Sequence, residues 1–500
     1  MQRFKLECKN YLLTLGIGDL RSYGRYVGVE RPTTKNKEDL IDAIISVLAG
    51  EVPPVPCSKL GAPVINKRFD PKIVETIEEL RLFHSNQIVF PMVPNPNAEV
   101  ELPPDESFIQ RYNEMKQRES ALWELEDPNA SEYVNSKRKV HTGQLETLNG
   151  VPFLLPLDCA EAERQILVPV EIIHEYGLQE GDVVDCNIDK GRNYDVATHV
   201  ERVNGFDVNV LERNSFQDGE VRYPTECVNL YDKSYCSSAA LKFIQWALPL
   251  GKGQRALLTS APKAGKTYLL QEIAKAAKEL NKDLETIILL IDQSPETVAA
   301  YRKSVDKDNL LYTTYDHEPD RQVFVAEFAL KRAKAMVESG RDVLLLVDSF
   351  NSLARAYNDT ELSSGGKMLS CGLESKTVQY LKKYFGAARC LDKGGSLTIM
   401  GAVTTATGNP ADDYLAAELG TLRNFGLALD EKLAYKRIYP ALDVAKAYLD
   451  VNYSLLSDDE QRVALAFCDG YVSKYGIEKA LQLLLECDSF ERFAERVLQD

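Results

Sequence analysis

The stretch Pro249–Leu270 reads PLGKGQRALLTSAPKAGKTYLL, and it decides the fold of the chain. Its apolar part predicts a strand at Arg255–Thr259, followed by a tight loop at Ser260–Gly265 and a helix that opens at Lys266 and Thr267. Loops of this kind point backbone N–H groups at phosphate oxygens, next to a lysine and a hydroxyl. The stretch therefore predicts a phosphate-binding loop.

The side chains of this loop have separate expected roles. Lys266 supplies a cation to the β- and γ-phosphates of ATP, and the Thr267 hydroxyl suits Mg²⁺. Ser260 stands where the pattern usually begins with glycine, a small departure because serine tolerates turns. An ordinary glycine turn is the competing interpretation. It is the weaker one, because GKT between an apolar strand and a helix is typical of nucleotide sites.

Composition limits the class of protein further. A chain of 500 residues holds roughly three or four domains. Its 59 Lys+Arg against 75 Asp+Glu give a net charge of -16, so any contact with nucleic acid must be local. The ten cysteines form no CxxC pair, which favours reduced thiols. The sequence has no signal peptide and no run of ~18 apolar residues, so we expect a cytoplasmic protein without a membrane partner.

Shifts in pattern divide the chain into five expected segments. These are a helical, SAP-like module at 1–51, a proline-punctuated and partly helical connector at 52–141, an OB-type barrel at 142–210, a P-loop α/β domain at 211–455, and a helical subdomain at 456–500. A plain helical hairpin explains the first segment nearly as well. Ser457 and Glu460 predict a capping box in the last segment.

The expected barrel rests on five short strand-like runs separated by turn residues, one of them QILVPVEII at 165–173. OB-type barrels bind single strands by stacking bases on aromatic rings above a basic groove. This segment has few aromatic residues and many acidic ones. A spacer role is therefore as well supported as RNA binding.

Four apolar runs after residue 250 predict a parallel sheet covered on both faces. The expected strands are Arg255–Thr259, Thr286–Asp292, Asp342–Asp348 and Ser396–Thr404, and helical patterns at Lys266–Leu280, Glu296–Ser304, Arg321–Ser339 and Ser375–Phe385 separate them. Strands that alternate with helices in this way predict a doubly wound α/β domain.

Two strand ends in this sheet carry candidate catalytic groups. Asp348 ends a buried strand at the edge where ligands bind in such sheets, so we expect it to hold Mg²⁺ together with Thr267. Capping of the next turn is the competing role. Hydrolysis also needs a group that orients water and an arginine from a neighbouring subunit. Gln293 occupies the position expected for the first of these.

Several stretches together resemble the family of the hexameric bacterial transcription terminator Rho. They are PLGKGQRALLTSAPKAGKTYLL, LLIDQSPE, VDSFNSLARAYN, YFGAARCLDKGGSLTI and KRIYPALD. The resemblance extends from about Gly143 to the C-terminus, and Met1–Glu51 fits the family's N-terminal module. It implies an RNA-binding OB barrel, a RecA-like motor domain and a ring of subunits with ATP between neighbours. It also implies single-stranded RNA in the centre, and RNA polymerase or another Rho-type subunit as a partner.

The resemblance transfers nucleotide-binding roles to particular residues. Lys263, Ala264 and Gly265 match the family's PKAGKT together with Lys266 and Thr267. Tyr439 falls where the family stacks an aromatic ring on adenine. The role of Lys266 at the transferred phosphate is likewise implied to be catalytic.

Departures from the family cluster at hydrolysis. The catalytic glutamate of the family's DERP motif reads Gln293, and its SRK motif reads Asp430, Glu431, Lys432. The motif that resembles the source of the trans-acting arginine reads Lys446–Asp450. Glu431 and Asp450 would put negative charge where a γ-phosphate needs positive charge.

The RNA-binding positions are also altered. Lys367 survives in the first pore loop, whereas the second pore loop, now Gly420–Asn424, has lost the family's lysine and glycines at their positions. In the barrel, Phe153 is the remaining one of two stacking rings. Two hypotheses follow: a Rho-like terminator whose ATP hydrolysis is impaired, or a degenerate Rho paralogue that binds nucleotide and regulates or co-assembles without translocating.

Overall fold

The computed structural model describes residues 9–48 and 140–499, with short gaps in both ranges. The gaps fall at 10, 13–14, 28 and 30–33, and at 149, 160–164, 191–193, 210–212, 235–237, 304, 363–366 and 451–454. The connector predicted at 52–141 lies outside the described residues, except for its last two. Each cysteine within the described ranges is free. Among these residues, no helix is both long and apolar enough to cross a membrane.

The chain forms two compact units, Met1–Val89 and Phe90–Asp500. In the first unit, helix α2 (Ile17–Tyr26) packs on α3 (Lys37–Leu48) around a small apolar core. Leu20, Leu40 and Ile44 are fully buried in that core. Short helices with one apolar face are what the sequence predicts for this segment.

The first described part of the second unit is a closed five-stranded barrel. Its strands are β1 (His141–Leu148), β2 (Val151–Leu155), β3 (Ile166–Leu167), β4 (Val183–Lys190) and β5 (Asp195–Val203). They run in the order β3-β2-β1-β4-β5, and a parallel pairing of β3 with β5 closes the ring. The short strand β6 (Phe206–Asp207) extends β5 as a hairpin.

One expected barrel strand is partly wrong. The run at 165–173 reads as a strand throughout, but β3 ends at Leu167 and helix α7 (Val170–Tyr176) follows. Pro169 starts the helix, where its missing N–H is not needed, and Gly177 ends it in the left-handed conformation at φ 59°. The helix buries Ile172 completely in the barrel core. Apolar runs this short fit either a strand or a helix, and burial on one helical face decides here.

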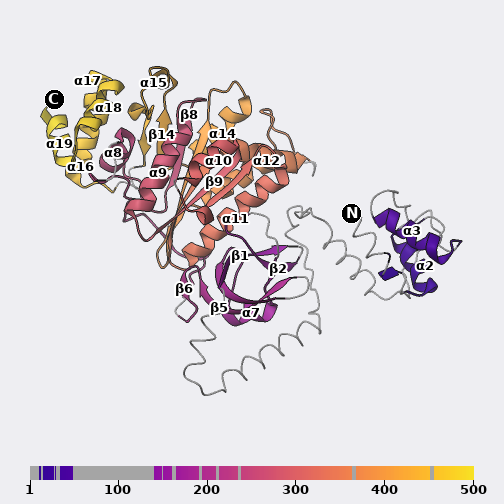
Figure 1. The fold of residues 1–500 in the computed structure, drawn as a ribbon. Helices are drawn as coiled ribbons and strands as arrows, with labels where there is room; N and C mark the ends of the chain where they lie inside the picture. The colour runs from indigo at the N-terminus through magenta and orange to yellow at the C-terminus, as the bar shows by residue number, and fades with distance from the viewer. Residues whose placement is uncertain are drawn as a thin grey trace, which may run out of the picture. The chain divides into compact units, whose positions relative to one another are not determined.

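The larger part of the second unit is an α/β domain around a mostly parallel sheet (Figure 1). Its main path runs β10-β9-β11-β13-β8-β14-β15. The strands are β8 (Arg255–Ser260), β9 (Leu284–Gln293), β10 (Leu310–Thr314), β11 (Asp342–Asp348), β13 (Ser396–Thr404), β14 (Phe425–Leu429) and β15 (Tyr448–Leu449). The short strands β7 (Val221–Arg222) and β12 (Arg389–Leu391) pair beside β13. The four strands predicted from the sequence are present, whereas β10 and β14 were not predicted.

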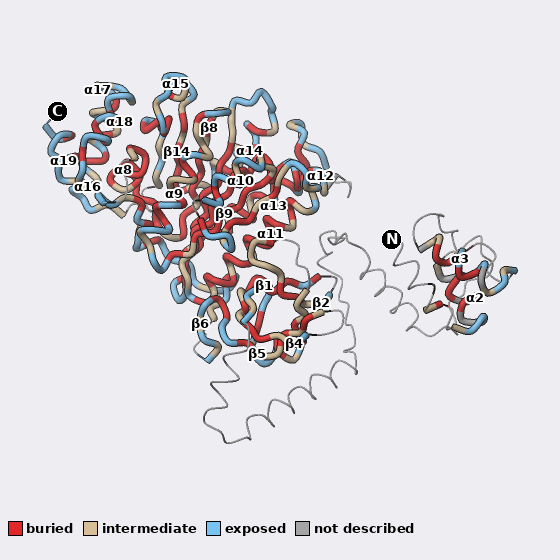
Figure 2. The backbone as a smooth tube through the Cα atoms, in the orientation of Figure 1, coloured by how far each residue is buried: buried red, intermediate tan, exposed pale blue. Residues whose placement is uncertain are grey.

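Helices cover both faces of this sheet, so its central strands are buried (Figure 2). The helices of this domain are α8 (Ala239–Trp246), α9 (Lys266–Leu280), α10 (Pro295–Arg302), α11 (Pro319–Glu338), α12 (Phe350–Leu362), α13 (Ser375–Gly386), α14 (Pro410–Gly420) and α15 (Glu431–Tyr435), with 3₁₀ turns at Lys307–Asn309 and Val444–Lys446. Leu344 faces a core with α9, and its neighbour Leu345 faces the opposite core with α11. Successive residues of one strand thus serve two cores.

The chain ends in a helical bundle beside α8 (Figure 1). It consists of α16 (Asp458–Leu465), a π-helical segment (Ala466–Tyr471), α17 (Val472–Tyr475), α18 (Ile477–Glu486) and α19 (Phe490–Gln499). The predicted capping box of Ser457 and Glu460 starts α16. Buried Lys242 of α8 donates to the carbonyls of Leu485 at 3.2 Å and Cys487 at 2.6 Å, which holds the bundle on the domain.

Arg332 of α11 joins the barrel to the α/β domain. Its side chain is fully buried, and Nε donates to Oε1 of Gln144 in β1 at 2.9 Å. Nη1 donates to the carbonyl of Asp308 at 2.8 Å, and Nη2 donates to the carbonyl of Leu157, just after β2. Burial lowers the pKa of Arg332 to about 10, so the guanidinium is still charged at neutral pH. One side chain therefore satisfies acceptors from three separate segments.

Replacing Arg332 with leucine is expected to destabilise the second unit. The change leaves several buried acceptors without a donor, at about 1–3 kcal/mol for each. We expect the free energy of unfolding, measured in urea, to fall by more than about 2 kcal/mol. The same substitution at Arg202, which is exposed on β5, should change it by less than about 0.5 kcal/mol. Equal stability of the two variants would contradict the role of Arg332.

Candidate functional site

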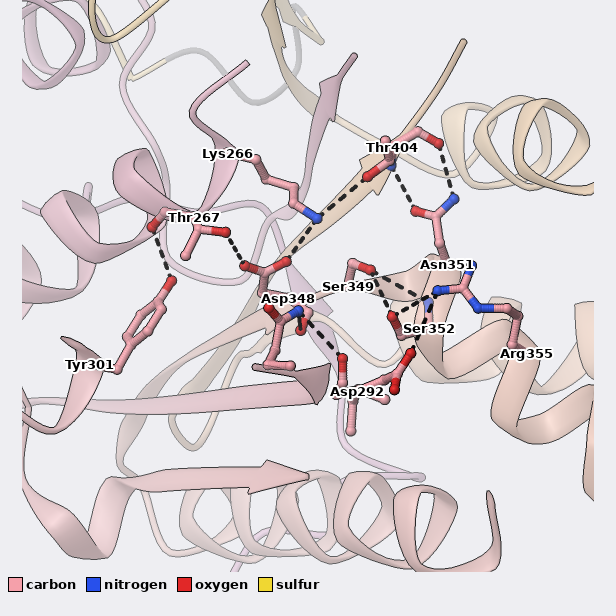
Figure 3. A network of polar contacts seen from close by, with 12 residues as sticks. Lys266, Thr267, Asp292, Tyr301, Asp348, Ser349, Asn351, Ser352, Arg355 and Thr404 are labelled. Atoms are coloured by element: carbon pink, nitrogen blue, oxygen red, sulfur yellow. Dashed lines mark hydrogen bonds and ion pairs between the residues drawn. The ribbon is translucent and has the colours of Figure 1, made fainter. Parts of the chain in front are cut away.

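Four neighbouring strands end at one edge of the sheet and bring polar side chains together there. These strands are β9, β11, β13 and β8, all parallel and adjacent in that order. The carboxyl ends of parallel strands are where α/β sheets bind ligands. Figure 3 shows the side chains that meet at this edge.

The loop between β8 and α9 has the backbone geometry that wraps around an anion. Lys263 and Gly265 have positive φ values of 61° and 92°, so two residues of the loop are left-handed. Gly265 directly precedes Lys266, the first residue of α9. Free N–H groups at the start of a 15-residue helix favour negative charge at this point. A Cβ atom at Gly265 would lie 3.3 Å from the ring of Tyr439, which therefore covers the loop.

Asp348 is the centre of the polar cluster. Its side chain is only 1% exposed, and Oδ1 pairs with Lys266 Nζ at 2.9 Å. Oδ2 accepts a hydrogen bond from Thr267 Oγ1, also at 2.9 Å. Figure 3 shows both side chains pointing at the carboxylate from the start of α9. The lysine, hydroxyl and acid that the sequence predicts to act together therefore do meet.

Tyr301 of α10 stabilises the first turn of α9 by a hydrogen bond to its backbone. Its hydroxyl donates to the carbonyl of Thr267 at 3.1 Å. Burial, with a smaller contribution from the Asp348 charge, raises the pKa of Tyr301 well above its ordinary value. The hydroxyl thus stays protonated and keeps its donor role at any physiological pH.

A cavity of about 510 Å³ opens above the loop. Its lining consists of Ser260, Ala261, Pro262, Lys263, Gly265, Lys266, Thr267, Tyr268, Thr404 and Tyr439. Ala264, also predicted to bind nucleotide, has a buried side chain and can contribute only its backbone. Tyr439 is half exposed at 52% and lines the cavity, so its ring is accessible there.

Gln293 ends β9 beside this cluster, but its amide is already engaged. Nε2 donates to the carbonyl of Asp348 at 3.2 Å and to that of Ile291 at 3.4 Å. The preceding residue, Asp292, has a positive φ of 56° and lies 3.9 Å from Arg355 of α12. The predicted water-orienting position is therefore tied to the backbone of the strand that carries Asp348.

The positions that replace the family's arginines have partners of their own. Asp430 caps α15 by accepting from the N–H of Lys432 at 2.8 Å, and exposed Glu431 accepts from the Tyr435 hydroxyl at 2.5 Å. Lys446 pairs with Asp443 at 2.8 Å. These side chains are absent from the cavity lining.

The two predicted RNA-binding residues lie away from the cavity and differ in exposure. Lys367 is exposed just before α13, where its carbonyl accepts from the N–H of Ser375 at 3.0 Å. Phe153 is only 7% exposed, and its ring packs on Tyr194 with centroids 5.4 Å apart. Base stacking needs an open ring face, so Phe153 does not offer one in this conformation.

Sequence reasoning missed several members of the site. Thr404 ends β13, and its hydroxyl lies 3.4 Å from Lys266 Nζ. Asn351 and Arg355 come from α12, just after Asp348, and Tyr268 lines the cavity from α9. The strand ending at Thr404 was predicted, so the rule that ligands bind at strand ends could have found this residue.

The fold and this site define a P-loop nucleotide-binding domain. Comparison with known proteins agrees: residues 240–448 match the family model described as ATP synthase alpha/beta family, nucleotide-binding domain. No cluster of three or more His, Cys, Asp or Glu that could hold a metal occurs among the described residues. Thr267 and Asp348 are the oxygen donors at this site that could hold a metal ion.

The most informative relatives are transcription termination factors Rho. That of Karelsulcia muelleri is 38% identical over 265 residues, which cover 53% of this chain and 69% of the relative. That of Bacillus subtilis is 36% identical over 61% of this chain and 72% of the relative. That of Pseudomonas aeruginosa is 35% identical over 64% of this chain and 77% of the relative. The chain belongs to the Rho family.

Replacing Lys266 with alanine is expected to weaken binding of ATP. A hydrogen bond to a charged group contributes about 1.5–3 kcal/mol, which corresponds to a roughly tenfold to hundredfold rise in Kd. Titration with a fluorescent ATP analogue would measure the change. Lys275→Ala, an exposed position on the same helix, is the matched control and should bind normally. Equal affinity of both variants would exclude a direct role for Lys266.

Proposed function

We propose that this chain binds ATP together with Mg²⁺ at the β8–α9 loop. The observation that carries the proposal is the meeting of Lys266, Thr267 and Asp348, with both contacts to the acid at 2.9 Å. Lys266 would bind the β- and γ-phosphates, and the start of α9 would hold them by its N–H groups. The half-exposed ring of Tyr439 would stack on the base.

The residues present fit a magnesium ion. Thr267 Oγ1 and Asp348 Oδ2 are hard oxygen donors 2.9 Å apart. Adjacent ligands of an octahedral Mg²⁺, with bonds of about 2.0–2.1 Å, lie at a similar separation of about 3 Å. Few protein ligands are needed, because Mg²⁺ keeps several waters and takes phosphate oxygens. The ion would neutralise phosphate charge while these two side chains hold it in place.

We propose further that the chain acts in a Rho-type ring in the cytoplasm. Its relatives are named transcription termination factors, and we extend that role to this chain. In this proposal the ring is a homo-oligomer, hexameric by family, and Lys367 contacts single-stranded RNA in its centre. RNA polymerase or another Rho-type subunit is the further partner.

We also propose that ATP hydrolysis is slow. A neutral amide accepts a proton from water far less readily than a carboxylate, and Gln293 Nε2 is held by two backbone carbonyls. The positions expected to supply arginines carry the acidic residues Glu431 and Asp450. Without these cations, the transition state loses a contribution of ~10³ or more in rate.

The same observations support a second candidate function. In it, the chain is a nucleotide-binding Rho paralogue that regulates or co-assembles with another subunit and does not translocate. Retention of Lys266, Thr267 and Asp348 beside altered catalytic positions favours a bound nucleotide as a structural or regulatory ligand.

Steady-state ATP turnover, with and without single-stranded RNA, separates the two candidates when nucleotide binding is measured in parallel. We expect tight binding with turnover well below one per second, under the usual enzyme range. RNA-stimulated turnover that is lost in Lys266→Ala would exclude the second candidate. Tight binding without any turnover would exclude the motor.

Restoring the family's glutamate by Gln293→Glu is expected to recover little turnover. A carboxylate has no N–H to donate, so it would face the carbonyls of Asp348 and Ile291 in place of bonding to them. The cations expected from a neighbouring subunit would still be missing. Gln293→Ala is the matched control for loss of the amide. A large gain in turnover for the glutamate variant would show that the base was the limiting loss.

A further inference from the structure

A second network leads away from the phosphate site through residues that the roles above leave unused. Its first member is Thr404, the last residue of β13, which pairs with Ser260 at the end of β8. Its hydroxyl lies 3.4 Å from Lys266 Nζ and lines the cavity. Figure 3 shows Lys266 between Asp348 and Thr404. A phosphate that binds Lys266 therefore comes within reach of this hydroxyl.

Asn351 of α12 holds the backbone of Thr404 on both sides. The Thr404 N–H donates to Asn351 Oδ1 at 2.7 Å, and Asn351 Nδ2 donates to the Thr404 carbonyl at 3.0 Å. Asn351 is 4% exposed, so water does not compete for these bonds. An amide that pairs with both polar groups of one residue couples the two rigidly.

The remaining N–H of Asn351 reaches a different helix. Nδ2 also donates to Oδ1 of Asp412 at 2.7 Å, in the first turn of α14. Asp412 is buried, and its Oδ2 accepts from Thr407 Oγ1 at 2.7 Å. The steps from Thr404 to α14 are thus hydrogen bonds of 2.7 to 3.0 Å, and the bond between Asn351 and Asp412 is buried.

Helix α14 connects this network to the segments expected to face RNA. It ends at Gly420, where the altered second pore segment Gly420–Asn424 begins. Glu418 near its end pairs with Lys382 of α13 at 2.6 Å, and α13 follows Lys367. A displacement at the start of α14 would therefore reach both segments.

We propose that Thr404 binds the terminal phosphate of the nucleotide and that Asn351 and Asp412 transmit its presence to α14. The inference rests on the proposed binding of ATP. In it, the Thr404 hydroxyl donates to a γ-phosphate oxygen in place of accepting from Lys266. Thr404 is a phosphate-binding residue in this arrangement, whereas Asn351 and Asp412 are positioning residues. A nucleoside diphosphate has no γ-phosphate, so it offers no partner for the Thr404 hydroxyl.

The first test compares the affinity of the full chain for ADP and for a non-hydrolysable ATP analogue by calorimetry. Thr404→Val keeps the shape and removes the hydroxyl, so the preference for the triphosphate is expected to fall about tenfold. Thr405→Val is the matched control, because its hydroxyl reaches only the Ser260 carbonyl, at 3.5 Å. An unchanged preference in Thr404→Val would overturn the role of Thr404.

The second test follows hydrogen exchange of residues 410–420 with each nucleotide bound. We expect slower exchange with the triphosphate analogue, and loss of that difference in Asp412→Ala when both nucleotides are present at saturating concentration. Asp413→Ala removes an acid from the same helical turn, but this one is exposed, and the difference should survive. Asp412→Asn keeps an oxygen that accepts from Asn351, so the difference in exchange should also survive in this variant. A difference that persists in Asp412→Ala would overturn the relay.

The unaltered chain separates this inference from the function on which it rests. If it binds neither nucleotide, the proposed function fails and the inference fails with it. If it binds both nucleotides with identical exchange in α14, only the inference is overturned.

Discussion

A carboxylate buried at the end of a strand sets the requirements for the whole P-loop domain. Asp348 is 1% exposed, and an uncompensated charge at such a position would be strongly destabilising. The ammonium of Lys266 and the hydroxyl of Thr267 compensate it. Both come from the first turn of one helix, so α9 must begin within hydrogen-bond reach of the end of β11. The sheet order, with only β13 between β11 and β8, satisfies that requirement.

The parts of this fold that could be predicted are those with a continuous local signal. Strands β11 and β13 have the bounds that their apolar runs indicate, because a strand covered on both faces is apolar throughout. Strand β14 has the sequence FGLAL and strand β10 has LLYTT, five residues each. Runs this short fit a strand or a helix segment equally well, and only their neighbours in the sheet decide. Helix α7 was missed for the same reason.

The residues of the candidate site also fall into those with a local sequence signal and those without one. Residues Lys263–Thr267 are contiguous, so their cooperation is visible in the sequence and the structure brings them together. Tyr439 lies far along the chain, and only the family resemblance suggested that it would cover the loop. Thr404 ends a predicted strand, but its place beside Lys266, and that of Asn351 beside Thr404, depend on β13 lying between β8 and β11. Strand order is a property of the folded sheet, and no local pattern of residues encodes it.

The buried guanidinium of Arg332 has a consequence for the order in which the chain matures during synthesis. Its barrel acceptors, the Gln144 side chain and the Leu157 carbonyl, precede it by 188 and 175 residues. The ribosome completes all five barrel strands long before it reaches α11, and N-terminal domains usually fold first. Here the barrel must wait for these polar contacts until residue 332 has emerged. The barrel is therefore made before the α/β domain, but its contacts are completed only with that domain.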